Sequence, residues 1–324
     1  MKPSFHVRPL NGPFDDPGLY IRVLREGRAI IFDLGFSTTL SPKDILKTTD
    51  IFVSHMHIDH FIGFDNILRV SLKKEIPLKL YGPEGFIGCV EGRLKGYTWN
   101  LIGDYPLSIE VSEVRDESLL KAVFRAEHSF TREDRGTEPF TGVLMKDSLC
   151  TVSAVILDHQ IPCLAFSLKE NFHINIDKSE LSRMDLPVGP WLRQLKASLR
   201  ENKDDSIFTI NERRYTLDEL RSAATITRGQ KLTYVVDSLG SEENREKIIR
   251  LAQGSDVLYI ETYFLDEDRA RARDRYHLTA KEAGRIAREA GAGRLEVLHV
   301  SPRYMNDFEK LLLEAQGEFE KEMT

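Results

Sequence analysis

A short histidine-rich motif constrains this chain more than any other feature. Residues 55–60 read H-M-H-I-D-H, and they directly follow the apolar run IFVS at residues 51–54. An apolar run rich in β-branched and aromatic residues predicts a buried strand, so the motif occupies the loop after that strand. Imidazoles interleaved with a carboxylate, without thiolates, are typical of a metal site. The spacing suits two metal ions better than one, and the side chains favour zinc, with iron or manganese as alternatives.

Four other apolar runs end at residues that bind metals or move protons. Asp33 follows IIF, Asp237 follows TYVV, Glu261 ends LYIE and His299 follows LEVL. Open sheets place their working side chains beyond the carboxyl ends of strands. We therefore expect these four residues to meet the histidine motif at one edge of a sheet.

Composition and charge narrow the classes of protein to consider. The chain has 324 residues and a formal charge of −6, so it is not a generally basic nucleic-acid binder. Its three cysteines, Cys89, Cys150 and Cys163, are far apart and form no C-x-x-C pair, which fits a reducing compartment. No apolar stretch resembles a signal peptide or a membrane span. We expect a cytoplasmic protein with no membrane association.

The order of predicted elements indicates one α/β domain with an insertion. Short strand-like runs fill the first 165 residues, and strands and helices alternate over the last 95. Helices are predicted at 61–72, 84–96, 241–252, 266–275, 279–290 and 305–322, and Thr279 with Glu282 forms a capping box. Residues 170–230 are charged and interrupted by proline and glycine. We expect a single domain over 1–324 with an arm inserted at 170–230.

The H-x-H-x-D-H motif resembles the hallmark of the metallo-β-lactamase superfamily, which implies an αβ/βα four-layer sandwich. Four further stretches resemble the ribonuclease Z family: VSAVILDHQIP at 152–162, LPVGPWLRQLK at 186–196, YVVDS at 234–238, and the segment 260–304 with IETYF, YHLTAKEAG and LHVSPRY. The resemblance implies a zinc phosphodiesterase that cuts tRNA precursors at their 3′ ends. It also implies a homodimer in which the arm, with Gly189 and Pro190, reaches RNA bound to the other subunit.

The family pattern also implies a ligand set for two zinc ions. His55, His57 and His159 would hold one zinc, Asp59, His60 and His299 the other, and Asp237 would bridge both. A metal-bound hydroxide would then attack the phosphodiester. His128 is an alternative third ligand, but it lies in charged sequence, whereas His159 follows a longer strand-like run. His6 and His173 show no partner spacing and are expected to be solvated or core histidines.

Three residues receive roles in proton transfer and support from the same resemblance. Asp59 would orient the hydroxide or take its proton, and His277 would protonate the departing oxygen. Glu261 would keep His277 charged, since a neighbouring carboxylate raises an imidazole pKa and sets its tautomer. Asp33 would support the metal loop by hydrogen bonds without binding metal. Ser301 and Arg303 either contact a substrate phosphate or belong to an ordinary loop.

The charge pattern leaves the substrate open. Residues 190–232 contain nine Lys/Arg against six Asp/Glu, and the helix pair 267–289 contains seven against five. These cations either follow phosphates or form i,i+4 pairs on a solvated face, and the pattern favours the pairs. One alternative is a ribonuclease Z-like enzyme for cyclic nucleotides or other small phosphodiesters. Another is a metal-stabilised RNA-binding protein without catalysis, against which the Glu261 and His277 pair argues.

Overall fold

The computed structural model describes residues 4–24, 26–36 and 39–322. The chain divides into two compact units, each described here by itself. The insert unit contains Ser4, Met145–Thr151 and Lys169–Gln230, and the main unit contains the described residues of the remaining ranges. The predicted arm sequence, 170–230, makes up most of the insert unit.

The first sheet of the main unit has eight strands among the described residues, in the order β1 to β8. The central strands β3 to β6 run parallel to one another, and hairpins flank them on both sides. The segment 115–142 supplies all of β7 and all of β8 at one edge of this sheet. The strands are β1 Phe5–Pro9, β2 Leu19–Val23, β3 Arg28–Phe32, β4 Thr48–Phe52, β5 Leu78–Gly82, β6 Ser108–Arg115, β7 Ser118–Arg125 and β8 Arg132–Pro139.

The second sheet has six strands in the described chain, in the order β18-β17-β16-β11-β10-β9. The strands β16, β17 and β18 are parallel, so their carboxyl ends share one edge. The strands are β9 Val143–Lys146, β10 Cys150–Asp158, β11 Pro162–Glu170, β16 Lys231–Val235, β17 Val257–Glu261 and β18 Leu295–Leu298.

Aromatic side chains join the two sheets face to face. The ring of Phe166 on β11 lies 5.2 Å from Phe32 on β3 and 5.7 Å from Phe52 on β4. Tyr234 on β16 lies 5.8 Å from Phe32. All four side chains are fully buried, and because aromatic rings bury a large apolar area, they form a strong contact between the layers.

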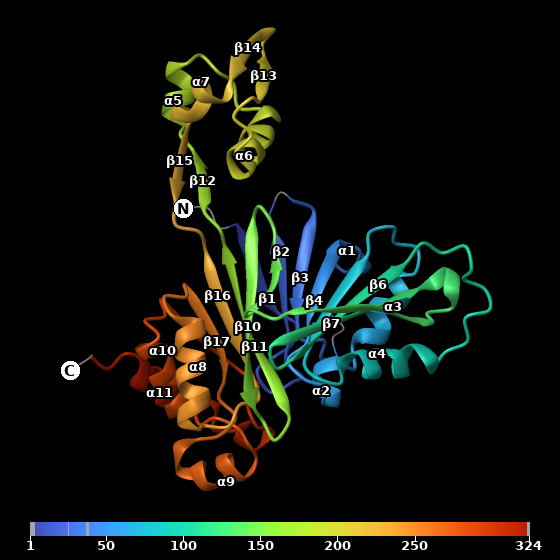
Figure 1. Cartoon of the computed structure of the whole chain (residues 1–324). Coiled ribbons are helices and arrows are strands. Elements are labelled where there is room, and N and C mark those ends of the chain that lie inside the picture. The colour runs from blue at the N-terminus through green and yellow to red at the C-terminus, as the bar shows by residue number, and fades with distance from the viewer. Residues whose placement is uncertain (1–3, 25, 37–38, 323–324) are drawn as a thin grey trace. The chain divides into compact units, whose positions relative to one another are not determined.

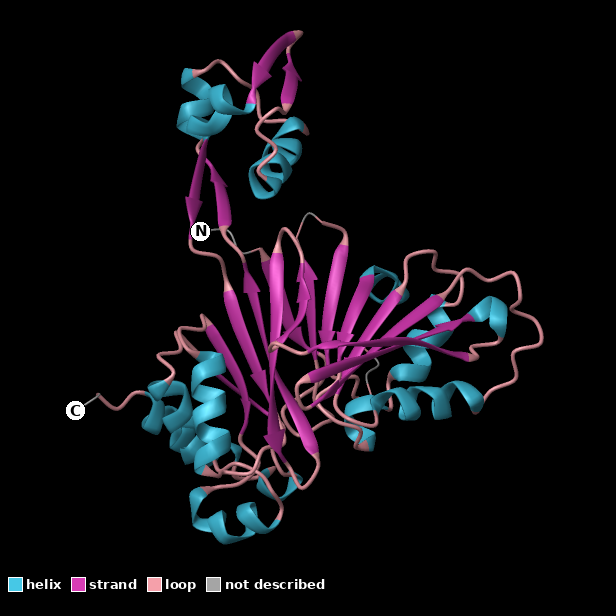
Figure 2. Cartoon of the chain, viewed as in Figure 1, coloured by secondary structure: helices cyan, strands magenta, loops and turns pink. Residues whose placement is uncertain are grey.

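Helices cover the outer face of each sheet (Figures 1 and 2). Helices α1 Pro42–Lys47, α3 Phe64–Ser71 and α4 Phe86–Lys95 pack their apolar residues on the first sheet. Helices α8 Glu242–Ala252, α10 Ala280–Glu289 and α11 Phe308–Phe319 pack on the second. The predicted four-layer αβ/βα sandwich is therefore confirmed. The short helix α2 Ile58–Phe61 contains the last residues of the histidine motif. The short helix α9 Arg269–Asp274 ends shortly before His277 in the sequence.

The insert unit has its own small core. Its apolar side chains, among them Leu195, Phe208 and Leu217, are buried together. One hairpin, β13–β14, a second antiparallel pair, β12–β15, and three helices surround them. These elements are β12 His173–Ile176, β13 Ile207–Ile210, β14 Arg213–Thr216, β15 Ala224–Thr227, α5 Lys178–Arg183, α6 Trp191–Glu201 and α7 Leu217–Leu220. The sequence showed only irregular, charged character here.

The predicted helices of the main unit agree with the structure. The capping box is present, because the Thr279 hydroxyl accepts from the backbone N–H of Glu282 and the Glu282 carboxylate accepts from that of Thr279. No helix in the described ranges combines the length and the apolar character needed to cross a bilayer.

Candidate metal centre

The predicted site residues follow the ends of strands and lie together at one edge of the main unit. Asp33 follows β3, His55 follows β4, His159 follows β10, Asp237 follows β16 and His299 follows β18. Asp33, Asp237 and His299 all have left-handed backbones, with φ of 55°, 49° and 50°. Residues other than glycine rarely adopt this backbone conformation, and those that do are concentrated at functional sites. The convergence predicted from the strand endings is present.

The first group of potential ligands surrounds one carboxylate oxygen of Asp237. The Nε2 atoms of His55 and His159 lie 3.2 Å and 3.6 Å from Asp237 Oδ2. His57 completes the group, whose ligand atoms all lie within 4.8 Å of one another. His128, the alternative to His159, is exposed and lies 3.0 Å from Glu133. The structure thus places His159, and not His128, beside the motif.

The second group contains Asp59, His60 and His299. The Nε2 atoms of His60 and His299 lie 3.4 Å and 3.5 Å from Asp59 Oδ2, and the ligand atoms again fall within 4.8 Å. Asp237 touches this group as well, at 3.2 Å from His60 Nε2 and 2.7 Å from His299 Nδ1. Asp237 therefore lies between the two groups.

Several buried polar atoms at this place lack hydrogen bonds within the described part of the chain. They are His55 Nε2, His60 Nε2, Asp237 Oδ1 and His299 Nδ1. A buried polar atom without a partner costs free energy, so such a concentration needs an explanation. Nitrogen and carboxylate oxygen atoms that face one another without hydrogen-bonding are what divalent cations bind. The residues present fit a metal centre.

Hydrogen bonds on the far side of the imidazoles orient them for this role. The His159 ring presents Nδ1 to the carbonyl oxygen of Tyr276 at 2.7 Å, so Nδ1 carries the proton and Nε2 is left with its lone pair. His60 Nδ1 lies 2.9 Å from Asp33 Oδ2, which directs Nε2 toward Asp237 in the same way. Partners of this kind fix the tautomer and the ring orientation of metal ligands.

Asp33 is the centre of a fully buried hydrogen-bond network. Its carboxylate accepts from the backbone N–H and the hydroxyl of Ser54 at 2.6 Å and 2.8 Å. It also accepts from the hydroxyl of Tyr234 at 2.9 Å. Asp33 belongs to neither of these two groups in the described chain, nor to a third group of potential ligands, Asp237, Glu261, His277 and His299. This geometry matches the supporting role that the sequence suggested.

The electrostatic environment favours positive charge on His60 and His299 and disfavours it on His55. Burial, together with the neighbouring His60, lowers the pKa of His55 to about 4, so its imidazole is neutral and can donate a lone pair. Burial opposes charge on His299 and His60 as well, yet the Asp237 carboxylate outweighs it and raises the pKa of both, that of His299 to about 10. Asp237 thus creates a field that stabilises positive charge here, whether protons or metal cations carry it.

His277 and Glu261 form a hydrogen-bonded pair at the same edge of the main unit. His277 Nδ1 lies 2.8 Å from Glu261 Oε2, and the buried Glu261 Oε1 accepts from the backbone N–H groups of Ser238 and Leu278. These bonds hold the carboxylate in place, so it determines the orientation of the imidazole. The ring of Tyr263 stacks on His277 at 3.9 Å with an interplanar angle of 8°. Tyr263 was not predicted from the sequence, although it lies only two residues after Glu261.

A cavity of 460 Å³ opens onto this arrangement. Its lining includes the predicted residues Ser301 and Arg303, and two that were not predicted, Arg271 and Arg275. Arg303 Nη1 is 3.4 Å from Asp268, so this guanidinium is already engaged. The predicted residues His57, Asp59, His159, Asp237, His277 and His299 also line the cavity.

Two predicted residues belong to the insert unit. Gly189 and Pro190 precede helix α6, and Pro190 is the residue at its N-terminal cap. A side chain at Gly189 would approach the indole of Trp191 to 3.2 Å, and that indole donates to the carbonyl oxygen of Pro187 at 2.9 Å. The Gly-Pro segment is thus part of a compact turn.

Comparison with solved structures supports the fold. The chain is similar to human tRNase Z, short form, with a TM-score of 0.55, 20% identity, and coverage of 92% of this chain and 93% of that one. It is also similar to YhfI, a metallo-β-lactamase fold protein from Bacillus subtilis, with a TM-score of 0.54, 16% identity and coverage of 97% and 92%. The protein therefore has the metallo-β-lactamase fold, and it combines that fold with candidate metal-ligand groups at the expected edge.

Sequence comparison is more specific. A protein named ribonuclease Z from Deinococcus radiodurans is 32% identical over 295 residues, which are 90% of this chain and 88% of the relative. No family model matches the chain. At this identity and coverage, the chain belongs to the ribonuclease Z family and is a metal-dependent hydrolase.

Proposed function

We propose that this protein is an endoribonuclease that removes the 3′ extension of tRNA precursors. One observation carries the proposal: Asp237 lies between two groups of potential metal ligands, and His277, which is bonded to Glu261, lines the same cavity as Asp237. This arrangement provides both cation binding and a proton donor within reach of one substrate phosphate. The relative from Deinococcus radiodurans, which is named ribonuclease Z, supports the choice of RNA as substrate.

The cofactors in this proposal are two zinc ions. One is held by His55, His57 and His159 and the other by Asp59, His60 and His299, with Asp237 shared between them. The donor set contains only imidazole nitrogen and carboxylate oxygen, which zinc accepts readily and which iron or manganese also tolerates. When bound, such cations make water nucleophilic at neutral pH and neutralise charge on a phosphoryl group.

The chain's own residues handle the protons. Asp59 lies at the mouth of the second group, where its carboxylate can orient the attacking water. Although burial opposes it, the imidazoles of His299 and His60 hold the pKa of Asp59 well below its usual range, so the carboxylate stays ionised and can accept a hydrogen bond from the water. His277 donates a proton to the departing ribose oxygen, and Glu261 orients its ring through the contact with Nδ1.

The proposal also assigns substrate contacts. Ser301 and Arg303 line the cavity and contact a phosphate of the RNA, Arg303 after exchanging its bond to Asp268. The Gly189–Pro190 turn of the insert unit contacts RNA bound to a second copy of the chain. The homodimer that this requires, and the cytoplasmic location, stay predictions from the sequence.

The test is incubation of zinc-loaded protein with a 3′-extended tRNA precursor, beside His277→Ala and a matched control, His128→Ala. His128 is an exposed histidine bonded to Glu133. We expect cleavage at one 3′ site, a loss of about 10²- to 10⁴-fold in rate for His277→Ala, and no change for His128→Ala. Hydrolysis of bis-p-nitrophenyl phosphate without any cleavage of the precursor would replace this proposal with the small-phosphodiester alternative.

A further inference from the structure

Helix α9 carries arginines at every second position. They are Arg269, Arg271 and Arg273 within the helix, and Arg275 at its C-terminal cap. An α-helix turns about 100° per residue, so residues four apart share a side and residues two apart lie on nearly opposite sides. Arg271 and Arg275 therefore form one row, and Arg269 and Arg273 form the other.

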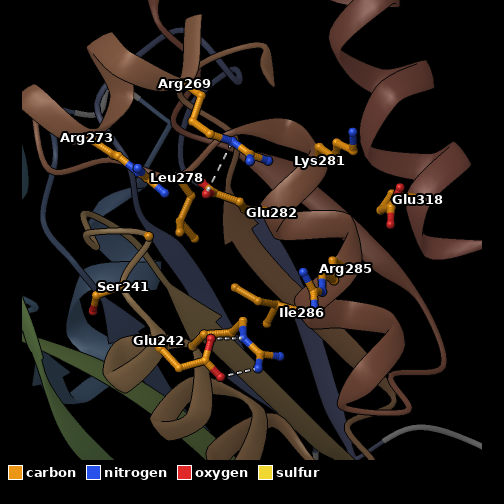
Figure 3. A pocket seen from close by; sticks show the side chains of 12 residues that line it. Ser241, Glu242, Arg269, Arg273, Leu278, Lys281, Glu282, Arg285, Ile286 and Glu318 are labelled. Atoms are coloured by element: carbon orange, nitrogen blue, oxygen red, sulfur yellow. Dashed lines mark hydrogen bonds and ion pairs between the residues drawn. The ribbon is translucent and has the colours of Figure 1, made fainter. Parts of the chain in front are cut away.

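The row of Arg269 and Arg273 faces a cavity in which glutamates accompany the cations. This cavity of 240 Å³ is also lined by Glu242, Glu282 and Glu318 (Figure 3). Arg269 lies 2.6 Å from Asp266 and 3.9 Å from Glu282. Carboxylates thus lie beside Arg269, whereas Arg273 is exposed and its guanidinium has no hydrogen-bond or ion-pair partner in the described chain.

The row of Arg271 and Arg275 faces a different cavity. Both residues line the 460 Å³ cavity of the candidate metal centre, and both are exposed. Neither guanidinium has a hydrogen-bond or ion-pair partner among the described residues. Most other cations of this helix pair are engaged: Lys281 with Asp266, Arg285 with Glu289 and Arg288 with Glu318. The i,i+4 pairing favoured by the sequence thus does not extend to Arg271 and Arg275.

We propose that Arg271 and Arg275 bind the phosphates of the RNA that flank the phosphodiester being cleaved. The inference rests on the proposed function and adds two positioning residues to it. The candidate ligand groups take the reacting phosphate, so cations elsewhere on the same cavity meet its neighbours. Guanidinium groups bind phosphate in a bidentate manner. A chain with a formal charge of −6 needs such a local concentration of positive charge to hold a polyanion.

The experiment compares Arg271→Gln/Arg275→Gln with Arg273→Gln and Arg250→Gln. Arg273 belongs to the opposite row, and Arg250 is an exposed arginine on α8 paired with Glu246. For the double variant we expect KM for the tRNA precursor to rise at least about tenfold while kcat changes less than about threefold. The loss should be larger on RNA than on bis-p-nitrophenyl phosphate, which has no flanking phosphates. Metal content serves as the control for an intact site.

Salt dependence gives a second readout. RNA affinity is measured in the His277→Ala background, which keeps bound RNA intact, with a short single-stranded RNA at increasing salt. Each lost phosphate contact should reduce the slope of log affinity against log salt by about 0.7, so the double variant should lose about 1 to 1.5. An unchanged slope and KM would overturn the inference. Equal losses in Arg273→Gln and Arg250→Gln would also overturn it, because general charge would then explain the effect.

The failure of this inference can be distinguished from the failure of the proposed function. If the unmodified protein does not cleave the precursor, the proposed function is wrong, and the affinity measurement still reports on Arg271 and Arg275. If the precursor is cleaved and the double variant behaves like the unmodified protein, only the role of the two arginines is wrong.

Discussion

Among the residues that the structure describes, each unit contains a buried group of histidine and carboxylate side chains. In the insert unit, the Glu170 carboxylate accepts from the Ser4 hydroxyl at 2.5 Å, lies 3.1 Å from His173 Nδ1 and accepts from the backbone N–H of Gln230. No atom of this group is among the buried unsatisfied polar atoms of the described chain. Around Asp237 in the main unit, four such atoms are unsatisfied.

The contrast separates a structural from a functional polar cluster. A buried polar network that satisfies its own members holds the chain together and offers nothing to a ligand. A network whose members face one another without hydrogen-bonding needs an additional partner. His173 is therefore a core histidine, one of the two outcomes expected from the sequence, while His55, His60 and His299 are candidate ligands.

Replacing the shared carboxylate should produce the largest effect. In Asp237→Ala both ligand groups lose the carboxylate that lies between them, so we expect binding of both metal ions to fail and kcat/KM to fall by at least about 1000-fold. Elemental analysis of the purified variant, beside the activity assay, measures both quantities. A variant that keeps two zinc ions and full activity would contradict the assignment of Asp237 as the shared ligand.

The corresponding change in the insert unit should affect stability and leave the metals in place. Glu170→Ala leaves Ser4 and His173 buried without their acceptor, so we expect the free energy of unfolding to fall by about 3 kcal/mol. The two tryptophans allow a local measurement, since Trp191 belongs to the insert unit and Trp99 to the main unit. In a Trp99→Phe background, urea unfolding followed by fluorescence reports on the insert unit alone.

This prediction sharpens the comparison through its control. Zinc content and bis-p-nitrophenyl phosphate hydrolysis should stay the same in Glu170→Ala, since Glu170 touches no candidate ligand among the described contacts. A loss of zinc in this variant would show that the two clusters are not independent, and the distinction drawn from their unsatisfied atoms would then fail.

Replacing Asp33, which bonds to a candidate ligand without being one, should have an intermediate effect on metal affinity. Asp33→Asn removes the charge that orients His60 and weakens the bonds from Ser54 and Tyr234. Loss of such support typically lowers metal affinity by about 10- to 100-fold, which competition with a chelator measures. The matched control is Asp50→Asn, a buried carboxylate on β4 paired with Arg28, and equal loss of zinc there would refute the specific role of Asp33.

These supporting contacts also mark the limit of what the sequence could predict. The place of the candidate site was predictable because Asp237, His299 and the histidine motif each follow an apolar run, and parallel strands end at a common edge. The assignment of ligands to two metal ions came from the family resemblance. The hydrogen bond from Tyr234 to Asp33 joins residues 201 positions apart, and Ser4 is 166 positions from Glu170. The Tyr276 carbonyl that holds His159 depends on a left-handed residue in a loop. Contacts set by the packing of remote segments leave no local pattern.

The smallest effect concerns the aromatic ring on His277. Tyr263 stacks on this imidazole, and an aromatic stack contributes about 0.5 to 1.5 kcal/mol beyond its buried area. Tyr263→Ala should therefore lower kcat for precursor cleavage by about two- to tenfold through a less well oriented proton donor, with little change in KM. Tyr263→Phe keeps the ring and should restore the rate. If the Phe variant is as slow as the Ala variant, the hydroxyl is the important group, and the stack does not position His277.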